Sequence, residues 1–236
     1  MRALLLAAGF GTRLRPITND TPKCLVNINE KPLLSYWFDI LSSTTIDKIL
    51  VNTHYLPEKV NEFIKSSASA SKVNVVFEET LLGTGGTILK NKEFFQEECF
   101  LVAHADNLTL FNLEDFIEAH HNRPNSVEIT MMTFDTDAPS TCGIVETNKD
   151  SIVIKFHEKV SNPPGNKANA AVYIFEPTII RFIEKLGKET IDISTEVLPF
   201  FMGKIQIFHN SNYHRDIGTI ESLRLANEEF EQLKKS

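Results

Sequence analysis

Two glycines and two basic residues near the start of the chain could form a phosphate-binding loop. Residues 4–25 read LLLAAGFGTRLRPITNDTPKCL, so Gly9 and Gly11 follow a short apolar run and are followed by Arg13 and Lys23. Glycine lacks a Cβ and tolerates positive φ, so its backbone N–H groups can approach anionic oxygens closely. Nearby cations balance the charge of a triphosphate. The stretch therefore predicts a phosphate cradle.

The spacing of this loop differs from those of two well-known phosphate loops. A dinucleotide-binding loop has a third glycine three residues after its second, where this chain has Leu14. A P-loop needs Gly-Lys-Ser or Gly-Lys-Thr four residues after its first glycine, and the sequence has neither. Pro16 and Pro22 also keep the segment from forming one long helix. The loop therefore binds phosphate in another manner.

The ordered matches in this loop resemble the opening signature of the sugar-1-phosphate nucleotidyltransferases. That signature is an apolar strand, Gly-x-Gly-Thr-Arg-Leu, a proline and then Pro-Lys-x-Leu. The chain matches it at Gly9, Gly11, Thr12, Arg13, Leu14, Pro16, Pro22, Lys23 and Leu25. The resemblance is to short members of the family without a β-helix domain, and to mannose-1-phosphate guanylyltransferase-like chains. It implies that Arg13 and Lys23 are catalytic. It implies nucleotide binding by Ala8, Gly9, Gly11 and Thr12.

A second group of glycines follows the apolar run Val73–Phe77. It starts at Gly83, reads GTGG, and comes after the pair Glu78-Glu79. Close backbone would let a flat base approach, and a carboxylate suits the N1–H and N2–H₂ donors of guanine. A flexible turn and solvated glutamates are the alternatives. In the resembled family a similar segment lines the base and ribose pocket, which implies nucleotide binding by Glu78, Gly83 and Thr84.

Two aspartates are candidate metal ligands. Asp106 follows an apolar strand expected at 99–103, and Asp216 precedes the last expected helix. A carboxylate beyond a strand's carboxyl end can hold a metal ion near phosphates, and capping of a helix or turn is the alternative. In the resembled enzymes an early Asp and the Asp of a late Asp-x-Gly-Thr segment hold Mg²⁺ together. The resemblance implies a Mg²⁺ cofactor here. Imidazole is a poor ligand for so hard an ion, so His104 and His214 are expected in supporting or structural positions.

Segments in the second half resemble the family's sugar-binding elements. Residues 156–159 read FHEK, similar to a Glu-Lys-Pro element, and residues 169–173 read NAAVY, similar to Asn-Ala-Gly-Ile-Tyr. The resemblance implies sugar-phosphate binding by Gly143, Glu158, Lys159 and Asn169. Val160 replaces the usual Pro, and Ala171 replaces the usual Gly. An added methyl group would narrow the pocket, so the sugar could differ from the commonest hexose phosphates.

Short apolar runs and amphipathic segments alternate along the first half of the chain. The expected strands are 2–8, 48–53, 73–77 and 99–103, and the expected helices are 32–42, 57–66, 85–90 and 112–121. This rhythm predicts an α/β fold with a doubly wound, mainly parallel Rossmann-like sheet. Ligands bind at the carboxyl ends of the strands in such a sheet.

The second half is expected to add a small β-rich, sugar-binding insertion. The expected strands are 127–134, 143–147, 152–157, 170–175 and 205–209, and the expected helices are 177–186, 194–202 and 219–235. We expect one nucleotidyltransferase domain over 1–236, with a nucleotide-binding half at 1–125 and a sugar-phosphate-binding half at 126–236.

Composition limits the partners and the compartment. The net charge of −7 disfavours nucleic acid and anionic membranes, which are polyanions. Cys24, Cys99 and Cys142 have no CxxC or Cys/His ligand spacing, so neither a disulfide framework nor structural zinc is expected. No apolar run approaches the ~18 residues of a membrane span. We expect a cytoplasmic protein, with a homodimer left open, and a solvated His120-His121 pair.

The reaction that the resemblance implies is transfer of a nucleoside monophosphate from an NTP to a sugar 1-phosphate. The products are a nucleotide sugar, for glycan or cell-surface synthesis, and pyrophosphate. We favour GTP with a mannose-like or heptose 1-phosphate; UTP with N-acetylmuramic acid or glucose 1-phosphate, and dTTP or CTP with another sugar phosphate, stay open. A cytidylyltransferase for a non-sugar phosphate and a catalytically silent nucleotide-sugar sensor are alternatives of other classes.

Overall fold

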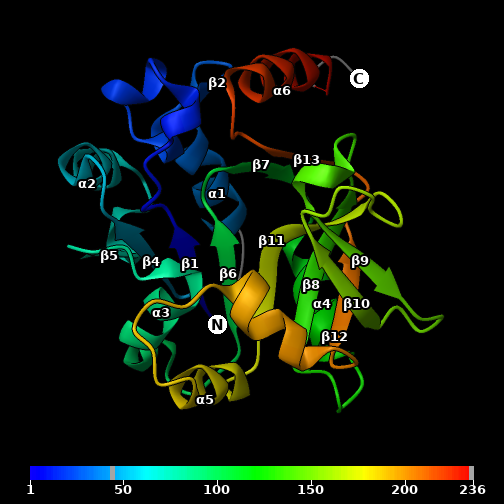
Figure 1. The fold of residues 1–236 in the computed structure, drawn as a ribbon. Helices are drawn as coiled ribbons and strands as arrows, with labels where there is room; N and C mark the ends of the chain where they lie inside the picture. The colour runs from blue at the N-terminus through cyan, green and yellow to red at the C-terminus, as the bar shows by residue number, and fades with distance from the viewer. Residues whose placement is uncertain (43–45, 234–236) are drawn as a thin grey trace. The chain divides into compact units, whose positions relative to one another are not determined.

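The computed structural model describes residues 1–42 and 46–233, which form both helices and strands (Figure 1). The α-helices are α1 (Leu33–Ser42), α2 (Pro57–Ser66), α3 (Gly83–Lys90), α4 (Leu113–His121), α5 (Thr178–Lys185) and α6 (Ile220–Leu233). The strands are β1 (Arg2–Leu6), β2 (Asn27–Ile28), β3 (Lys31–Pro32), β4 (Lys48–Thr53), β5 (Val73–Phe77), β6 (Phe100–His104), β7 (Asn107–Leu110), β8 (Ile129–Asp135), β9 (Gly143–Thr147), β10 (Val153–Glu158), β11 (Lys167–Phe175), β12 (Ile205–His209) and β13 (Tyr213–Asp216).

Most predicted elements are present, and α2, β4, β5, β9 and β12 have the predicted bounds. The helix predicted at 194–202 is wrong in type: a π-helical turn at Ile193–Val197 is followed by a 3₁₀ turn at Leu198–Phe201. Pro199 lacks an N–H and so interrupts regular α-helical bonding there. The last predicted helix is present as α6, and its predicted end at residue 235 lies outside the described residues. Four short strands, β2, β3, β7 and β13, were not predicted.

The chain divides into two compact units, each built from separate stretches. The N-terminal unit contains Ala3–Leu81, His104–Phe111 and the chain from Tyr213 onward. The central unit contains Met1–Arg2, Leu82–Ala103 and Asn112–Asn212. The single domain with halves divided after residue 125 stays a prediction.

Parallel strands form the sheet of the N-terminal unit. In it, β4 pairs in parallel with β5, from Ile49 opposite Val73 to Thr53 opposite Phe77, and β1 lies next to β4. β1 and β4 are apolar and mostly buried, as expected for parallel strands covered on both faces. The glycine loop follows β1 and Glu78 follows β5, so candidate binding residues come after the strand ends.

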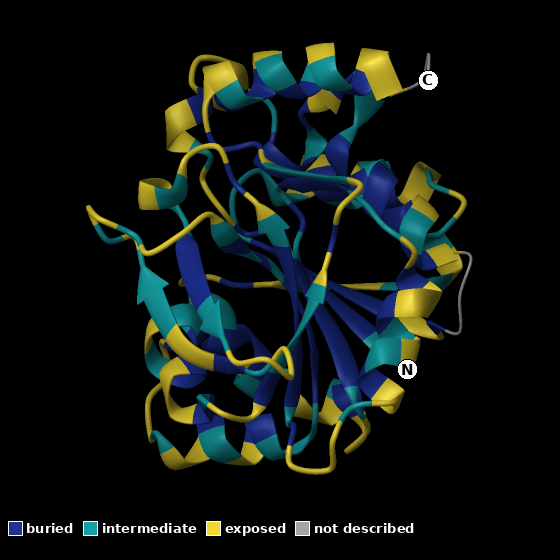
Figure 2. Cartoon of the chain, turned by 90° about the vertical axis from the view of Figure 1, so that its right-hand side faces the viewer, coloured by how far each residue is buried: buried dark blue, intermediate teal, exposed yellow. Residues whose placement is uncertain are grey.

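A second, antiparallel pair in the N-terminal unit joins β7 to β13, with Asp216 opposite Asn107. Leu108 of β7 is packed in a buried cluster with residues of α1 and α6, among them Leu33 and Phe230. The indole N–H of Trp37 in α1 also donates to the carbonyl of Asn107 at 3.0 Å. Helix α6, which ends near the label C in Figure 2, has exposed and buried residues on opposite faces. These contacts fix the two segments that carry the candidate metal ligands.

The central unit has the β-rich character predicted after residue 125. Strand β11 pairs antiparallel with β6, β8 and β9, while β12 pairs in parallel with β8. The aromatic rings of Tyr173 and Phe175 stack at 5.0 Å between centroids, and both residues are buried. Helices α3 and α5 contact each other in this unit. β11 is irregular between Asn169 and Tyr173, within the segment predicted to bind sugar.

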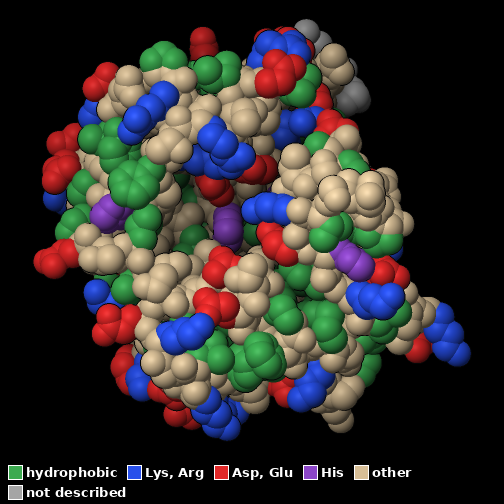
Figure 3. Space-filling model, viewed as in Figure 1, with side chains coloured by type: hydrophobic (Ala, Val, Ile, Leu, Met, Phe, Trp, Pro, Cys, Tyr) green, Lys and Arg blue, Asp and Glu red, His purple; other side chains and the backbone are tan. Residues whose placement is uncertain are grey.

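Three general predictions from composition can be compared with the structure. Cys24, Cys99 and Cys142 are free thiols, as predicted, and burial raises the pKa of Cys24 to about 12. Acidic and basic side chains are interspersed over the face drawn in Figure 3. Among residues 1–42 and 46–233, no helix combines the length and the apolar character that crossing a membrane requires.

Candidate nucleotide and metal site

The glycine loop begins directly after β1. The Ala7 N–H donates to the Asn52 side-chain carbonyl at 2.8 Å, which ties the start of the loop to β4. Gly11 has φ 63°, and a Cβ there would lie 3.0 Å from a Thr18 methyl group, so both conformation and space require glycine. Gly9 is exposed, and a Cβ built on it would meet no atom within 4 Å. Packing and backbone conformation therefore explain why residue 11 is a glycine. The space at Gly9 is open to a ligand.

Arg13 lies in a 3₁₀ turn, Thr12–Leu14, that buried Leu14 anchors to the core. Its guanidinium is next to Gly218, because a Cβ on Gly218 would lie 3.1 Å from Arg13 Nη2. The same point is 2.7 Å from Asp216 Oδ2. Gly218 therefore leaves the room in which the Arg13 and Asp216 side chains lie beside each other.

The structure brings together Lys23 and both predicted metal ligands. Lys23 Nζ lies 2.5 Å from Asp106 Oδ2 and 3.4 Å from Asp216 Oδ1. The β7–β13 pairing creates this geometry, since Asp106 immediately precedes β7 and Asp216 ends β13. The Ile217 N–H also donates to the Asp106 carbonyl at 3.1 Å. Two aspartates that are 110 positions apart in the sequence thus face one cation.

Neighbouring charges in this cluster shift the pKa values of Lys23 and Asp106. Burial disfavours the charged form of Lys23, but Asp106 and Asp216 outweigh it and raise the Lys23 pKa. Burial also opposes ionisation of Asp106, yet Lys23 and His104 hold its pKa below the usual value. At neutral pH the cluster therefore contains an ammonium and a carboxylate. Converging carboxylate oxygens already bind one cation here, and oxygen ligands are those that Mg²⁺ prefers, so these residues fit the predicted metal.

The neighbouring histidines are poor candidates for binding such a hard ion. His214 lies opposite Thr109 in the β13–β7 register. Loss of solvent lowers the His214 pKa to about 3, so its ring is neutral at physiological pH. Neutral imidazole suits softer metals better than magnesium. The supporting or structural position of His214 stays a prediction.

Glu78 is fixed at the end of β5 by a partner that the sequence did not reveal. Its side chain is buried, and Asn52 Nδ2 donates to Glu78 Oε1 at 3.1 Å. The Glu78 carbonyl accepts from His54 Nδ1 at 2.7 Å. Because Asn52 also accepts from Ala7, it links the loop to the carboxylate. The sequence did contain one indication of this contact, an asparagine in the apolar strand KILVNT. A polar side chain that is buried in a strand needs a hydrogen-bond partner.

Aromatic rings flank this end of the sheet. Phe10 of the glycine loop contacts the His54 ring edge-to-face at 5.0 Å, and His54 stacks on Phe77 at 6.4 Å. Phe10 and Phe77 are among the exposed large hydrophobic residues. Tyr55 donates to the Thr18 carbonyl at 3.0 Å and so fastens the loop from the same side. The loop is therefore attached to the end of β4 and the residues after it through side chains.

Gly83 and Thr84 belong to the central unit, where they contact the segment 189–193. A Cβ on Gly83, whose φ is +71°, would lie 2.5 Å from the Ile191 carbonyl oxygen. The Gly85 N–H donates to that oxygen at 2.8 Å, and the Ile193 N–H donates to Thr84 Oγ1 at 2.8 Å. Close packing within the unit is thus a sufficient reason for these glycines. Their contact with a nucleotide stays a prediction.

Gly143 and Glu158 face each other across the β9–β10 ladder. A Cβ on Gly143 would lie 2.5 Å from the Phe156 ring and 2.7 Å from Glu158 Oε2, so the space above this glycine is filled by those side chains. Lys159 has φ 48°, and its ammonium lies 3.2 Å from Glu158 Oε1. Glu158 and Lys159 are thus paired as neighbours, and their binding of a sugar phosphate stays a prediction.

Asn169 uses both ends of its amide within the central unit. Its Nδ2 donates to the Tyr173 hydroxyl at 2.6 Å, and its Oδ1 accepts from the Ala171 N–H at 3.0 Å. The Ala171 backbone has φ 53°, in the left-handed region. This backbone conformation explains why the resembled family has a glycine where this chain has Ala171. The contact of Asn169 with a sugar stays a prediction.

Replacing Ala171 by Gly is expected to stabilise the protein. Relief of the left-handed strain exceeds the entropy that glycine adds to the unfolded chain, which leaves a gain of about 0.5–1 kcal/mol. The midpoint of thermal unfolding should rise by roughly 1–3 °C. Ala170 is buried and outside the positive-φ positions, so Ala170→Gly should lower the midpoint. An unchanged or lower midpoint for Ala171→Gly would contradict the strain.

A separate Cys/His/Glu group in the central unit is a hydrogen-bond network. Cys99, His120 and Glu176 each place one potential ligand atom within 4.8 Å of the others. His120 Nε2, however, donates to Glu176 Oε1 at 3.1 Å, and Arg123 pairs with the same carboxylate. A proton on Nε2 and a competing guanidinium disfavour a metal there. His120 is fully buried, so the prediction that it is solvated is wrong: it packs inward and bonds to Thr130.

Buried His120 should make stability depend on pH. Burial, with Arg123 next in importance, lowers its pKa to about 3, whereas an unfolded histidine titrates near ~6.5. Below about pH 6.5 the histidine binds a proton in the unfolded chain but not in the folded chain, so acidification favours unfolding. From pH 7 to 5 this site should cost about 2 kcal/mol of unfolding free energy.

The measurement is urea unfolding of the wild type and His120→Gln at pH 7 and pH 5. The variant should lose less unfolding free energy than the wild type between pH 7 and pH 5. Glu176 and Arg123 are present in both proteins, so their contributions to the pH dependence largely cancel. Equal pH dependence would rule out a neutral buried imidazole at this position. His121→Gln, one residue along, is the matched control.

Comparisons with known proteins place this chain in a family. A family model described as Nucleotidyl transferase matches residues 2–233. Mannose-1-phosphate guanylyltransferase of Mycobacterium tuberculosis is 31% identical over 93% of this chain and 61% of that protein. UTP–glucose-1-phosphate uridylyltransferase of Synechocystis is 30% identical over 84% of this chain and 54% of that protein. The chain therefore spans about three fifths or less of the length of these curated relatives.

Solved structures of similar fold cover nearly the whole chain. A Bacillus anthracis structure, named as a glucose-1-phosphate thymidylyltransferase, has a TM-score of 0.86 at 20% identity and covers 97% of this chain and 94% of its own. HddC from Yersinia pseudotuberculosis has a TM-score of 0.79 at 26% identity over 97% of this chain and 99% of its own, and it was also solved with GMP-PN. The predicted α/β fold with a mainly parallel central sheet is confirmed. The chain belongs to the nucleotidyl transferase family.

Proposed function

We propose that this protein transfers a nucleoside monophosphate from an NTP to a sugar 1-phosphate and releases pyrophosphate. The observation that carries the proposal is the convergence of Asp106 and Asp216 on one cation in the same unit as the glycine loop. Family membership and the printed activities of the curated relatives support it. The sugar phosphate oxygen is already anionic and attacks the α-phosphorus, so neither a nucleophilic side chain nor a general base is needed.

In this proposal the N-terminal unit binds and orients the triphosphate. Gly9, with open space above it, offers backbone N–H groups, as do Ala8, Gly11 and Thr12. Arg13 would stabilise the charge that grows on the departing pyrophosphate. Asp106 and Asp216 would hold Mg²⁺, which, when bound, lowers the repulsion between the two anionic reactants. Positioning and charge neutralisation account for most of such catalysis.

The central unit would bind the sugar 1-phosphate. Glu158 offers acceptors for hydroxyl groups, and the mobile charge of Lys159, whose side chain is 65% exposed, can pair with the phosphate. Since both ends of the Asn169 amide already have partners, we infer that it acts through Tyr173 and the Ala171 backbone, whose shape it fixes.

Guanine is the favoured base. The M. tuberculosis relative is named for GTP chemistry, and the Yersinia structure contains GMP-PN. In this chain, Glu78 is a carboxylate oriented by Asn52 at the end of β5, and guanine offers two adjacent donors that a carboxylate can accept from. Uracil is the second candidate, because the Synechocystis relative is named for UTP.

The test is a panel of GTP, UTP, dTTP and CTP against mannose, glucose, heptose and N-acetylmuramic acid 1-phosphates with Mg²⁺, read by pyrophosphate release. We expect the highest kcat/KM with GTP and a mannose-like or heptose 1-phosphate. UTP turnover well above GTP turnover would end the preference for guanine. Absence of pyrophosphate release with every pair, from folded protein, would overturn the proposed reaction.

A further inference from the structure

The Lys23 ammonium pairs with both of the aspartates that are the predicted metal ligands. Its ammonium is 2.5 Å from Asp106 Oδ2 and 3.4 Å from Asp216 Oδ1, and its side chain is only 9% exposed. A magnesium ion sits about 2.1 Å from its oxygen ligands. An ion on the same Asp106 oxygen would therefore be within about 4.6 Å of Nζ, the sum of the two contacts. Two cations at that separation repel each other strongly when shielded from water.

The stem of Lys23 lies against the glycine loop. A Cβ built on Gly11 would be 3.1 Å from Lys23 Cβ, so loop and lysine stem are in contact. Lysine has a long, flexible side chain with a compact charge. Rotation about its side-chain bonds can therefore move Nζ from the carboxylates toward an anion held by the loop, with no change in the backbone.

We propose that Lys23 is an internal counter-ion of the metal site, which pairs with Asp106 and Asp216 in the unliganded protein and leaves them when a divalent cation binds. The displaced ammonium then becomes available to a phosphate of the NTP. This inference rests on the proposed function, because it takes the two aspartates as the metal ligands. It gives Lys23 two successive partners rather than phosphate alone.

The backbone holds the two carboxylates together without help from Lys23. Asp216 is opposite Asn107 in the β13–β7 ladder, and Ile217 N–H bonds to the Asp106 carbonyl. Removing the lysine therefore removes a competitor for the carboxylates and leaves their spacing intact. A metal ion then binds without having to break a charge-assisted hydrogen bond, which is among the stronger interactions in proteins.

The first experiment measures Mn²⁺ binding to nucleotide-free protein by the electron paramagnetic resonance signal of free Mn²⁺. Lys23→Met, which removes the charge and keeps an unbranched side chain one atom shorter, should bind Mn²⁺ roughly 10- to 100-fold more tightly than wild type. Lys31→Met is the matched control, since Lys31 pairs with exposed Asp39, and its affinity should not change. Equal or weaker Mn²⁺ binding by folded Lys23→Met would overturn the proposal.

A second measurement uses the wild-type chain and so does not depend on the folding of a variant. Lysines are acylated with a limiting reagent, with and without Mn²⁺, and the rate at each site is read by mass spectrometry. Lys23 should react slowly without the ion and several-fold faster with it, while Lys31 should not change. The same Lys23 rate at saturating Mn²⁺ would mean that the ammonium stays on the carboxylates.

Asp106→Asn separates this inference from the metal assignment itself. If it abolishes Mn²⁺ binding while Lys23→Met binds no more tightly than wild type, the counter-ion role fails and the metal ligands stand. If Mn²⁺ binding is unchanged in Asp106→Asn, or is missing from every form, the metal assignment fails and the counter-ion role fails with it. Loss of binding in Asp106→Asn, together with tighter binding in Lys23→Met, supports both.

Discussion

Asp106→Asn is expected to lower turnover by about 10²–10³ with the fold preserved, because one preorganised charge of the reacting site is lost. The change keeps the size of the side chain and removes the carboxylate that lies 2.5 Å from Lys23 Nζ. In the proposed reaction that carboxylate holds the cation that reduces repulsion between the anions. Initial rates of pyrophosphate release at saturating NTP and Mg²⁺ measure the effect.

The control for Asp106→Asn is Asp39→Asn. Asp39 is also paired with a lysine, Lys31, but its side chain is 66% exposed, and exposed pairs contribute little to stability or function. Its rate should stay within about twofold of wild type. Circular dichroism and the thermal midpoint show whether each variant is folded. Near-wild-type turnover of folded Asp106→Asn would remove Asp106 from the metal site.

The residues of the cluster were predictable from sequence, but their arrangement was not. Asp106 was visible because it follows an apolar strand, and Lys23 because it belongs to an ordered motif. Their contact depends on β7 and β13, each four residues long. β13 reads YHRD and has no apolar alternation, so local propensity does not reveal it. Its pairing with β7 is decided by contacts across more than a hundred residues of sequence, which a local pattern cannot encode.

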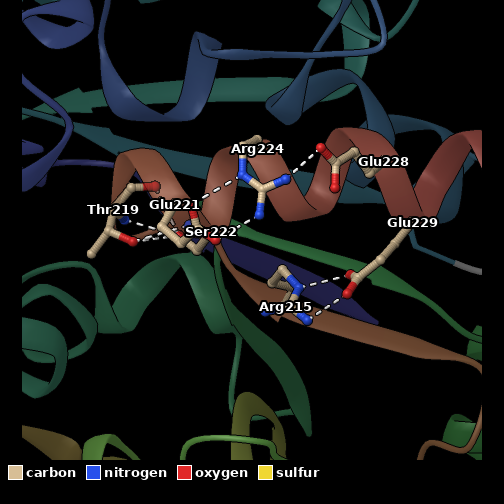
Figure 4. Close-up of polar contacts among 7 residues, drawn as sticks. All are labelled: Arg215, Thr219, Glu221, Ser222, Arg224, Glu228 and Glu229. Carbon is tan, nitrogen blue, oxygen red and sulfur yellow. Dashed lines mark hydrogen bonds and ion pairs between the residues drawn. The ribbon is translucent and has the colours of Figure 1, made fainter.

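Strand β13 is held to α6 by side-chain hydrogen bonds. Arg215 donates through Nε and Nη2 to the two carboxylate oxygens of Glu229, at 2.8 and 2.7 Å (Figure 4). This bidentate pair joins β13 to α6, directly beside Asp216. The Ser222 N–H donates to Thr219 Oγ1 at 3.0 Å at the start of the same helix. Thr219, rather than Asp216, therefore accepts from the first turn of α6.

Glycines illustrate why sequence predicts a site less well than a fold. The GTGG run at Gly83 and the loop at Gly9 look alike in sequence, since both place small residues after a strand. In the structure, Gly83 is packed against the Ile191 carbonyl, whereas Gly9 faces open space. A missing Cβ serves close packing and ligand approach equally well. Close packing and ligand approach can be distinguished only by the neighbours of each glycine. Those neighbours come from distant segments of the chain.

Arg13→Ala is expected to reduce kcat by about 10²–10³ while changing the KM for NTP much less. The reason is that Arg13 is assigned to charge that develops on the leaving pyrophosphate, and an interaction made mainly in the transition state appears in kcat. Arg13 is exposed and lies in a turn anchored by Leu14, so its removal should leave the thermal midpoint nearly unchanged.

Arg15→Ala is the matched control for this assignment. Arg15 is two residues away, is exposed, carries the same charge and lies outside the Gly-x-Gly-Thr-Arg-Leu match. A general need for positive charge near the triphosphate would slow both variants alike and raise both KM values. A loss of kcat confined to Arg13→Ala instead requires a guanidinium at one place, beside Asp216 and Gly218. If Arg13→Ala retains wild-type kcat, the charge on the leaving group must be stabilised by another residue.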